Sequence, residues 1–359
     1  MTDRSRAEAA LRSSLERMAG RRAGMPAPLV RVSAPDWEFG FGDVDKPFHA
    51  ASSGKLFTAT LIGMLAEQGL LALDSPIGRL LPHADVAGLP AAAGVDVGRA
   101  VTVQQLLAHT SGIPDFFDPP RGRATEASVR TLSRHRDRLW TPADLLDQAR
   151  SLPAVGRPGE RFHYSDTGYV LLGRIAEEAG GESFAAQLRT RLFEPTGMER
   201  ASTPYDSTLI PDDLSTIDVA PFWIEGEEFS RARCVSLDWA GGNVVATADD
   251  FIRFQRALFG GRLIDAGLLE HLIRPRRRFR RGIHYGAGIM TLRFDEFIPL
   301  VMRGLSQPVG HLGVWASHVF SHREHEAHVV LNFHSTSMRE MNESFRTHAR
   351  VARILAGKG

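Results

Sequence analysis

Strand-forming patterns lie near both ends of this chain, and helical patterns fill the middle. The segment PLVRVSAPDWEFGFG (residues 28–42) partly alternates and ends at glycine, which predicts strand structure. HYGAGIMTLRF, GVWASHVF and AHVVLNFHS predict further strands near the carboxyl end. This order favours an α+β fold, in which both chain ends build one antiparallel sheet and a mostly helical lobe is inserted between them.

The helices are predicted from apolar periodicity and from capping signals. Thr102 with Gln105 forms a capping-box pattern, and Thr141 followed by proline marks another helix start. Further helices are predicted over residues 5–20, 56–69, 167–180, 183–193, 249–258 and 340–355. We expect one catalytic domain over residues 1–359, with an α/β lobe at 1–60 and 240–359, flanked by the terminal helices, and a helical lobe at 61–239.

The charges of the chain are nearly balanced, with 43 Lys and Arg against 42 Asp and Glu and a formal net charge of +1. That balance gives no electrostatic case for a nucleic-acid or membrane partner. The single cysteine, Cys234, cannot form an internal disulfide and is expected to be buried. The first residues carry scattered charges and no apolar run typical of a secretory signal, so a cytoplasmic location is predicted.

Ser52-Ser53-Gly54-Lys55 places a serine three residues before a lysine at the start of a predicted helix. On a helix this spacing puts both side chains on one face, within reach of each other. The apolar residues that follow Lys55 would desolvate its amine and lower its pKa, which would make it a base for Ser52. The helix start would also offer the Ser52 N–H to a developing oxyanion. Ser52 is therefore a candidate nucleophile.

Two later segments carry candidate partners for this pair. Tyr164 lies between a Pro-Gly-Glu turn and a predicted helix, where its phenol could act as a proton donor or acceptor. The alternative is a tyrosine packed at a helix start, with Asp166 as an ordinary cap. His311 and Gly313 precede a predicted strand, where glycine permits close approach of a ligand and the Val314 N–H would complete an oxyanion hole. Without such roles, the first would be a packed tyrosine and the second a turn with an exposed histidine.

The three motifs, in this order and with their flanks, resemble those of the class C β-lactamase, penicillin-binding protein and family VIII esterase group. HAASSGKLFTATLIGMLAEQGLLALDSPIGRLLP is similar to the nucleophile helix of that family and its continuation. VTVQQLLAHTSGIPDF, PGERFHYSDTGYVLLGRIAEEAGG, RLFEPTGMERAST and AGGNVVATADDFIRF are similar to its other signature segments. The resemblance spans roughly residues 48–335 and implies a two-lobed β-lactamase/transpeptidase-like fold.

The resemblance also implies roles for the site residues. Ser52 would be the acylated nucleophile, and Lys55 would deprotonate it or tune the tyrosine. Tyr164 would be the base for attack and the proton donor to the leaving group. His311 takes the position of the lysine in the Lys-Thr-Gly strand of the family, and Val314 with Ser52 would supply the oxyanion N–H groups. No cofactor and no metal ion is expected.

The chain departs from the β-lactamase pattern at positions that contact substrate. Asp166 stands where the β-lactamases carry asparagine, and a carboxylate there would favour an amine or pair with Lys55. His311, Leu312 and Val314 replace a lysine and hydroxyl residues that hold a substrate carboxylate, at about 1.5–3 kcal/mol per charged hydrogen bond. These changes predict an esterase-type hydrolase or acyl transferase for small ester, amide or lactam substrates, with weak or no β-lactamase activity. A β-lactamase, a D-alanyl-D-alanine carboxypeptidase or D-aminopeptidase, and a catalytically silent binding protein remain as alternatives.

Other readings of the sequence are weaker. The Gly-x-Ser-x-Gly elbow of an α/β-hydrolase is missing from the chain. The histidines at 318, 322, 325, 328 and 334 have a ligand-like spacing, but they fall in a predicted hairpin, where side chains diverge, so we interpret them as polar turn residues. The arginine-rich run 274–281 is interpreted as a solvated loop that could line the cleft rim. Residues 115–140 and the stretch around Phe222, Trp223 and Phe229 are expected to shape the cleft. The sequence does not indicate an oligomeric state.

Overall fold

The sheet of the computed structural model combines strands from both ends of the chain; the structure describes residues 3–22, 24–297, 299–300 and 302–358. Its eight strands follow the order β2-β1-β12-β11-β10-β9-β8-β7, and neighbouring strands run antiparallel. Leu29 of β1 lies opposite Asn332 of β12, which confirms the predicted sheet. The strands are β1 (Leu29–Ala34), β2 (Trp37–Phe41), β7 (Arg277–Arg280), β8 (Ile283–Tyr285), β9 (Met290–Leu292), β10 (Val309–Gly313), β11 (Ser317–His322) and β12 (Ala327–Asn332). Two short pairs lie outside it, β3 (Phe48–His49) with β6 (Val245–Ala246), and β4 (Trp223–Ile224) with β5 (Glu227–Glu228).

The predicted helix starts are confirmed at both capping boxes. The Thr102 hydroxyl accepts the N–H of Gln105, and the Thr141 hydroxyl accepts the N–H of Asp144. The helices are α1 (Asp3–Ala19), α2 (Lys55–Glu67), α3 (His83–Val86), α4 (Val97–Ala100), α5 (Val103–Leu107), α6 (Pro142–Arg150), α7 (Asp166–Gly180), α8 (Phe184–Leu188), α9 (Glu194–Thr196), α10 (Trp239–Gly242), α11 (Ala248–Phe259), α12 (Ala266–Ile273), α13 (Phe294–Phe297) and α14 (Met338–Leu355).

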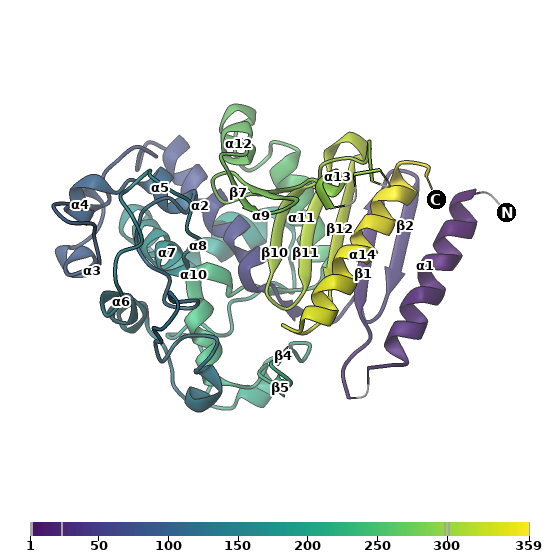
Figure 1. The fold of residues 1–359 in the computed structure, drawn as a ribbon, viewed down its shortest axis with the longest axis horizontal. Helices are drawn as coiled ribbons and strands as arrows, with labels where there is room; N and C mark the ends of the chain where they lie inside the picture. The colour runs from purple at the N-terminus through teal and green to yellow at the C-terminus, as the bar shows by residue number, and fades with distance from the viewer. Residues whose placement is uncertain (1–2, 23, 298, 301, 359) are drawn as a thin grey trace.

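The sheet is covered by helices on both faces. Figure 1 shows α1 and α14 side by side over one face, and the residues of that layer include Leu15 and Ile354 from the helices with Val329 and Leu331 from β12. Val330, between those two strand residues, belongs instead to the core shared with α2 and α11. This alternation is the pleat of a strand buried on both sides.

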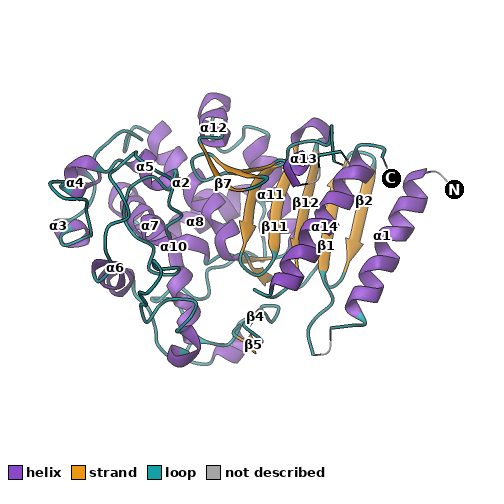
Figure 2. Cartoon of the chain, in the orientation of Figure 1, coloured by secondary structure: helices purple, strands orange, loops and turns teal. Residues whose placement is uncertain are grey.

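The helices α3 to α8 gather on the side of the molecule away from α1 and α14, as Figure 2 shows. Helices α2 and α7 pack against each other, and α2 also contacts β10 of the sheet. The α+β architecture with an inserted helical region is confirmed, whereas the exact limits of the two lobes stay a prediction. Among the described residues, no helix is both long and apolar enough to cross a membrane.

The arginine-rich run does not form the loop that its composition suggested. Residues 277–280 form β7, the edge strand of the sheet, and pair with β8. The arginine side chains of this strand are exposed, while Phe279 between them is partly buried against the ring of Tyr164. Charged side chains are common on edge strands, which a composition argument overlooks.

Three of the histidines interpreted as turn residues, His318, His322 and His334, are in fact buried. His318 and His322 lie on the same face of β11, because a spacing of four residues returns a strand side chain to one face. Both rings meet His348 of α14: Nδ1 of His318 and Nδ1 of His348 are 3.0 Å apart, as are the Nε2 atoms of His322 and His348. Since His348 uses opposite nitrogens for its two neighbours, the three rings do not converge on one point. In the described part of the chain, no group of three or more His, Cys, Asp or Glu is arranged to hold a metal ion.

The buried histidines predict a loss of stability in mild acid. Burial lowers the pKa of His318 to about 3, whereas the ordinary value is 6.5. Below pH 6.5 the unfolded chain therefore takes up protons that the folded protein does not, so the free energy of unfolding should fall as the pH drops from 6.5 toward 3. The expected loss is about 1 kcal/mol per such histidine between pH 6.5 and 5.5. Urea denaturation at both pH values measures it. His318→Asn should reduce this pH dependence and the exposed His83→Asn should not; an equal slope in all three proteins would contradict the prediction.

Candidate active site

Ser52 lies on a short turn that joins β3 to α2. This turn, Ala51–Gly54, is a 3-10 helix, and Ala51 has a φ of 48°, in the left-handed region that a non-glycine residue rarely adopts. The Nδ1 atom of His49 accepts the Ala51 N–H at 3.0 Å and the Trp315 indole N–H at 3.1 Å, which fixes the turn from both sides. A backbone strain of about 1–3 kcal/mol at such a position is typical of functional sites.

Two glycines allow this turn to lie directly against α10. A Cβ atom on Gly54 would lie 2.7 Å from the Gly242 Cα, and a Cβ atom on Gly242 would lie 2.5 Å from the Ala51 carbonyl oxygen. Neither distance leaves room for a side chain. The position of Ser52 therefore depends on backbone-to-backbone packing between two segments about 190 residues apart in the sequence.

Lys55 is fully buried, and each of its three N–H donors has an acceptor. Its Nζ atom donates to the Asp166 carboxylate, to the Gly241 carbonyl at 2.8 Å and to the Ser52 Oγ at 3.3 Å. The expected fall in the pKa of Lys55 is wrong. Burial does act to lower it, but the negative charge of Asp166, helped by Tyr164 and Asp238, outweighs that effect and raises the pKa. The pairing of Asp166 with Lys55, one of the two expectations for that carboxylate, is confirmed.

The phenol of Tyr164 faces this pair. Its hydroxyl is buried and has no well-aligned hydrogen-bond partner among the described residues, and Lys55 Nζ lies 5.1 Å from the centre of its ring. Burial raises the pKa of Tyr164, while the Lys55 charge and the nearby Ser52 hydroxyl act in the opposite direction. His109 and Phe279 hold the ring, at centroid distances of 4.2 and 5.3 Å. The structure thus brings Ser52, Lys55 and Tyr164 together.

A second carboxyl group, that of Asp115, is hydrogen-bonded to the backbone of Asp166. Asp115 accepts the backbone N–H of Asp166 at 3.0 Å and that of Phe117 at 3.1 Å. Burial and the neighbouring charge of Asp166 raise the pKa of Asp115 to about 8. Sequence reasoning did not single out Asp115, although it lies within the family-like segment VTVQQLLAHTSGIPDF.

His311 is buried and neutral, so the alternative of an exposed histidine is wrong. Its Nδ1 lies 2.7 Å from the Leu312 carbonyl, to which it can only donate, so its Nε2 accepts the hydrogen bond of the Tyr285 hydroxyl at 3.0 Å. Burial, with the nearby Lys55 charge, lowers the pKa of His311 to about 3. The Tyr285 hydroxyl in turn lies 3.1 Å from His109 Nε2. His311 therefore cannot replace the positive charge of a lysine.

Tyr285→Phe should destabilise the protein by about 1–3 kcal/mol, because it leaves buried nitrogens of His109 and His311 without a partner while keeping the ring. The free energy of unfolding from urea denaturation measures this change. Tyr205→Phe is a matched control, since that buried hydroxyl bonds to one carbonyl, of Ser230, at 2.7 Å. A smaller loss for Tyr285→Phe than for the control would contradict a linking role for the Tyr285 hydroxyl.

The end of β10 lies against the nucleophile turn. A Cβ atom on Gly313 would lie 2.5 Å from the Ala50 carbonyl oxygen, and Ser53 Oγ donates to the His311 carbonyl at 3.2 Å. Val314, the next residue, lines the same pocket as Ser52. The glycine of this motif thus permits the close approach of the nucleophile turn, while the close approach of a ligand stays a prediction.

A small pocket, with an internal volume of about 20 Å³ and partly open to solvent, lies beside Ser52. Its other walls are mostly apolar, and Asp238 is the one acidic side chain besides Asp166. The lining residues are Ser52, Phe117, Leu132, Asp166, Ile224, Val235, Leu237, Asp238, Val314 and Trp315. Two segments expected to shape the cleft therefore contribute to it, residues 115–140 and the stretch after Phe222, whereas sequence reasoning missed Asp238 and Trp315. Cys234, which directly precedes the pocket residue Val235, is buried, as predicted.

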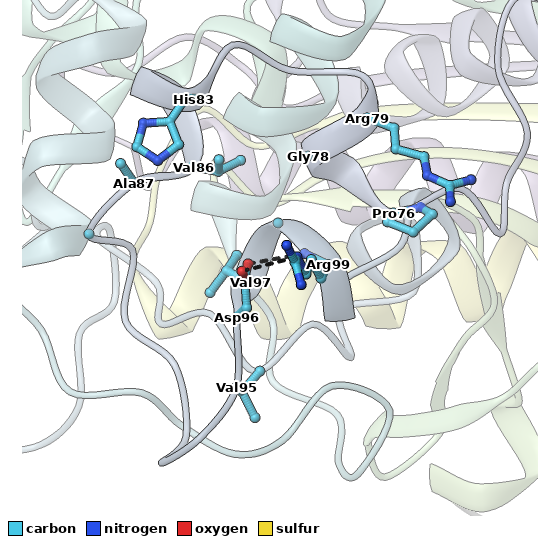
Figure 3. A pocket seen from close by; sticks show the side chains of 12 residues that line it. Pro76, Gly78, Arg79, His83, Val86, Ala87, Val95, Asp96, Val97 and Arg99 are labelled. Carbon is cyan, nitrogen blue, oxygen red and sulfur yellow. Dashed lines mark hydrogen bonds and ion pairs between the residues drawn. The ribbon is translucent and has the colours of Figure 1, made fainter.

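A larger hollow lies between residues 76 and 99, in the helical part (Figure 3). Its polar features are His83 and the Asp96–Arg99 pair, whose nitrogen and oxygen are 3.7 Å apart. None of its twelve lining residues is a serine, cysteine, lysine or tyrosine. It therefore offers no hydroxyl, thiol or amine nucleophile of the kind found around Ser52.

Comparisons with known proteins agree with this fold. The family model described as Beta-lactamase matches residues 32–353. Penicillin-binding protein 4* of Bacillus subtilis (strain 168) is 30% identical over 282 residues, 75% of this chain and 55% of that protein. The chain spans about half the length of the first curated relatives it matches.

Solved structures show the same fold at lower identity. The D-amino acid amidase of Ochrobactrum anthropi SV3 in complex with L-phenylalanine amide is 23% identical, with a TM-score of 0.77 and coverage of 98% of this chain and 99% of that one. EstCE1, described as a hydrolase with promiscuous acyltransferase activity, is 17% identical, with a TM-score of 0.72 and coverage of 97% and 98%. The β-lactamase/transpeptidase-like fold predicted from the sequence is confirmed.

Proposed function

Because the chain belongs to the Beta-lactamase family, we propose that it is a serine hydrolase that forms an acyl-enzyme on Ser52 with small esters or amides, and that ester hydrolysis or acyl transfer is favoured over β-lactam hydrolysis. The observation that carries this proposal is the 3.3 Å contact between Ser52 Oγ and Lys55 Nζ beside the unpartnered phenol of Tyr164. A serine hydroxyl becomes a useful nucleophile only where a neighbouring group can take its proton.

The charge state of Lys55 shapes the proposed acylation step. Ser52 Oγ bonds to the substrate carbonyl carbon and loses its proton; because Lys55 is an ammonium group, it can accept that proton only as it passes one of its own to Asp166. Tyr164 then gives its phenolic proton to the leaving oxygen or nitrogen as the bond from that atom to the carbonyl carbon breaks. Asp166 returns its proton through Lys55 to Tyr164. Water repeats the sequence on the acyl-enzyme and releases the acid.

The backbone N–H groups of Ser52 and Val314 are the proposed donors to the oxyanion. Both residues line the pocket, and the Gly313 contact with Ala50 brings their two segments together. Such preorganised donors stabilise the negative charge that develops on the carbonyl oxygen.

The charge of the pocket supports esters and neutral amides over penicillins and carboxyl-terminal peptides. No arginine, lysine or histidine is among its lining residues, and two carboxyl groups are. His311, at the position that would bind a carboxylate, is neutral and fully engaged in hydrogen bonds. A substrate carboxylate would therefore meet repulsion where the β-lactamase pattern provides a cation. The cytoplasmic location and the lack of nucleic-acid or membrane partners stay predictions from the sequence.

A fluorophosphonate probe with peptide mapping by mass spectrometry tests the nucleophile. We expect the adduct on Ser52, no labelling of Ser52→Ala, and labelling of Ser53→Ala, which removes the neighbouring hydroxyl. Turnover of p-nitrophenyl butyrate should then exceed that of nitrocefin in kcat/KM. Absence of an adduct on Ser52 would remove the proposal, and nitrocefin turnover equal to that of the ester would remove the substrate preference.

A further inference from the structure

The carboxylate of Asp238 projects into the wall of the pocket that contains Ser52. Asp238 ends the short turn Arg233–Asp238 and immediately precedes α10, whose glycines pack against the nucleophile turn. Its Oδ1, the Asp166 Oδ1 and the Lys55 Nζ all lie within 3.6 Å of the point where a Cβ atom on Gly241 would stand. The carboxylate is thus a close neighbour of the reacting groups, and its side chain is 17% exposed.

Asp238 has no partner of its own, although it is mostly buried. Among the residues that the structure describes, no N–H or O–H group donates a hydrogen bond to its carboxylate. The three N–H donors of Lys55 already form hydrogen bonds with Asp166, Gly241 and Ser52. A mostly buried carboxylate without a donor costs free energy, so such a group calls for an explanation.

His49 does not supply the missing positive charge. Its Nε2 points at the Asp238 Oδ2 from 3.7 Å, beyond hydrogen-bond distance, and that buried nitrogen has no other partner. Its Nδ1 accepts two N–H groups and therefore carries no proton. The imidazole is then neutral, in agreement with a pKa that burial lowers to about 3.

The rest of the pocket gives Asp238 a distinct function. Most other side chains that line the pocket are apolar, with Phe117, Leu237 and Trp315 among them. A single unpaired charge in an apolar pocket fixes the orientation of a ligand that carries the opposite charge. Asp166 cannot serve in this way, because Lys55 already neutralises it.

We propose that Asp238 binds the ammonium group of the substrate, so that the enzyme acts on esters or amides that carry a primary amine near the scissile carbonyl. The inference rests on the proposed acyl-enzyme chemistry and names its substrate class. Binding of the cation supplies the donor that Asp238 lacks, and places the carbonyl carbon beside Ser52. Burial, reinforced by Asp166 and opposed by Lys55, raises the pKa of Asp238 to about 7, and a bound ammonium group would favour its ionised form.

A pair of matched esters tests this assignment. Benzyl β-alaninate and benzyl butyrate have the same shape, but the first carries an ammonium group where the second carries a methyl group. The wild-type enzyme should show a kcat/KM about 10- to 100-fold higher for the amino ester near neutral pH, as expected for one charged hydrogen-bonded contact. Asp238→Asn should abolish most of that ratio. Asp147→Asn, which removes an exposed carboxylate on α6, should retain it.

Binding without turnover gives a second readout. Butylammonium should protect Ser52 from the fluorophosphonate probe better than butanol does in the wild type, and equally well in Asp238→Asn. If Ser52 is labelled but the ester ratio and the protection are the same in wild type and Asp238→Asn, the ammonium assignment is wrong while the proposed nucleophile stands. If Ser52 is not labelled at all, the proposed function fails, and this inference fails with it.

Discussion

Replacing Lys55 by methionine should reduce kcat/KM for p-nitrophenyl butyrate by about 10³-fold or more, because Ser52 loses the group that receives its proton. The same change should lower the free energy of unfolding by about 3–5 kcal/mol, since it leaves the buried Asp166 carboxylate without its counter-charge. Urea denaturation and steady-state kinetics measure the two effects separately.

A double variant separates the loss of catalysis from the loss of stability. Lys55→Met combined with Asp166→Asn removes both charges, so most of the lost unfolding free energy should return. Activity should not return, because Lys55, the group proposed to receive the proton of Ser52, is still missing. A double variant as unstable as Lys55→Met would show that Asp166 is not the group that Lys55 neutralises.

Gly242→Ala should reduce kcat/KM by about 10²-fold, although residue 242 contributes no side chain to the chemistry. The added methyl group would meet the Ala51 carbonyl oxygen at 2.5 Å and the Asp238 carboxylate at 2.6 Å, so the turn that carries Ser52 must move. A displacement of about 1 Å at a nucleophile costs rate on this scale. The free energy of unfolding should fall by about 1–3 kcal/mol, as for other overpacked sites.

Gly20→Ala is the matched control for this steric argument. A Cβ atom on Gly20 would come no closer than 3.6 Å to its nearest neighbour, and its backbone is not left-handed. Kinetics and urea denaturation of both variants should therefore differ sharply. Wild-type activity in Gly242→Ala would mean that the close contact between α10 and the nucleophile turn does not position Ser52.

Local signals were sufficient for most of the fold. The capping boxes at Thr102 and Thr141 depend on residues three positions apart, so they can be read from a short segment. The arginine-rich run shows where such reading fails, because its strand conformation depends on pairing with β8 rather than on its composition. His348 shows the same limit, since only the packing of α14 on β11 brings it between His318 and His322.

The proximity of Ser52, Lys55 and Tyr164 was predictable because each residue lies in a segment with strong family resemblance. The electrostatics of the site could not be predicted from the sequence. Lys55 looked like a desolvated amine from its apolar flanks, yet its charge state depends on Asp166, 111 residues away. No sequence motif around Asp238 indicates a function. Its proposed role depends on the hydrogen bonds of Lys55, whose three N–H donors already have other acceptors.

The pairing of β1 with β12 also constrains how the protein folds while it is being synthesised. Leu29 and Asn332 are neighbours in the sheet, so the amino-terminal hairpin leaves the ribosome long before its partner strand exists. Until then one edge of β1 stays unpaired in the nascent chain, where it can associate with other chains or be shielded by a chaperone. Closing such a long loop is slow, and Val314 and Trp315, which line the pocket beside Ser52, are made late as well. A truncated translation product therefore contains Ser52 but lacks the residues that complete the sheet and the pocket around it.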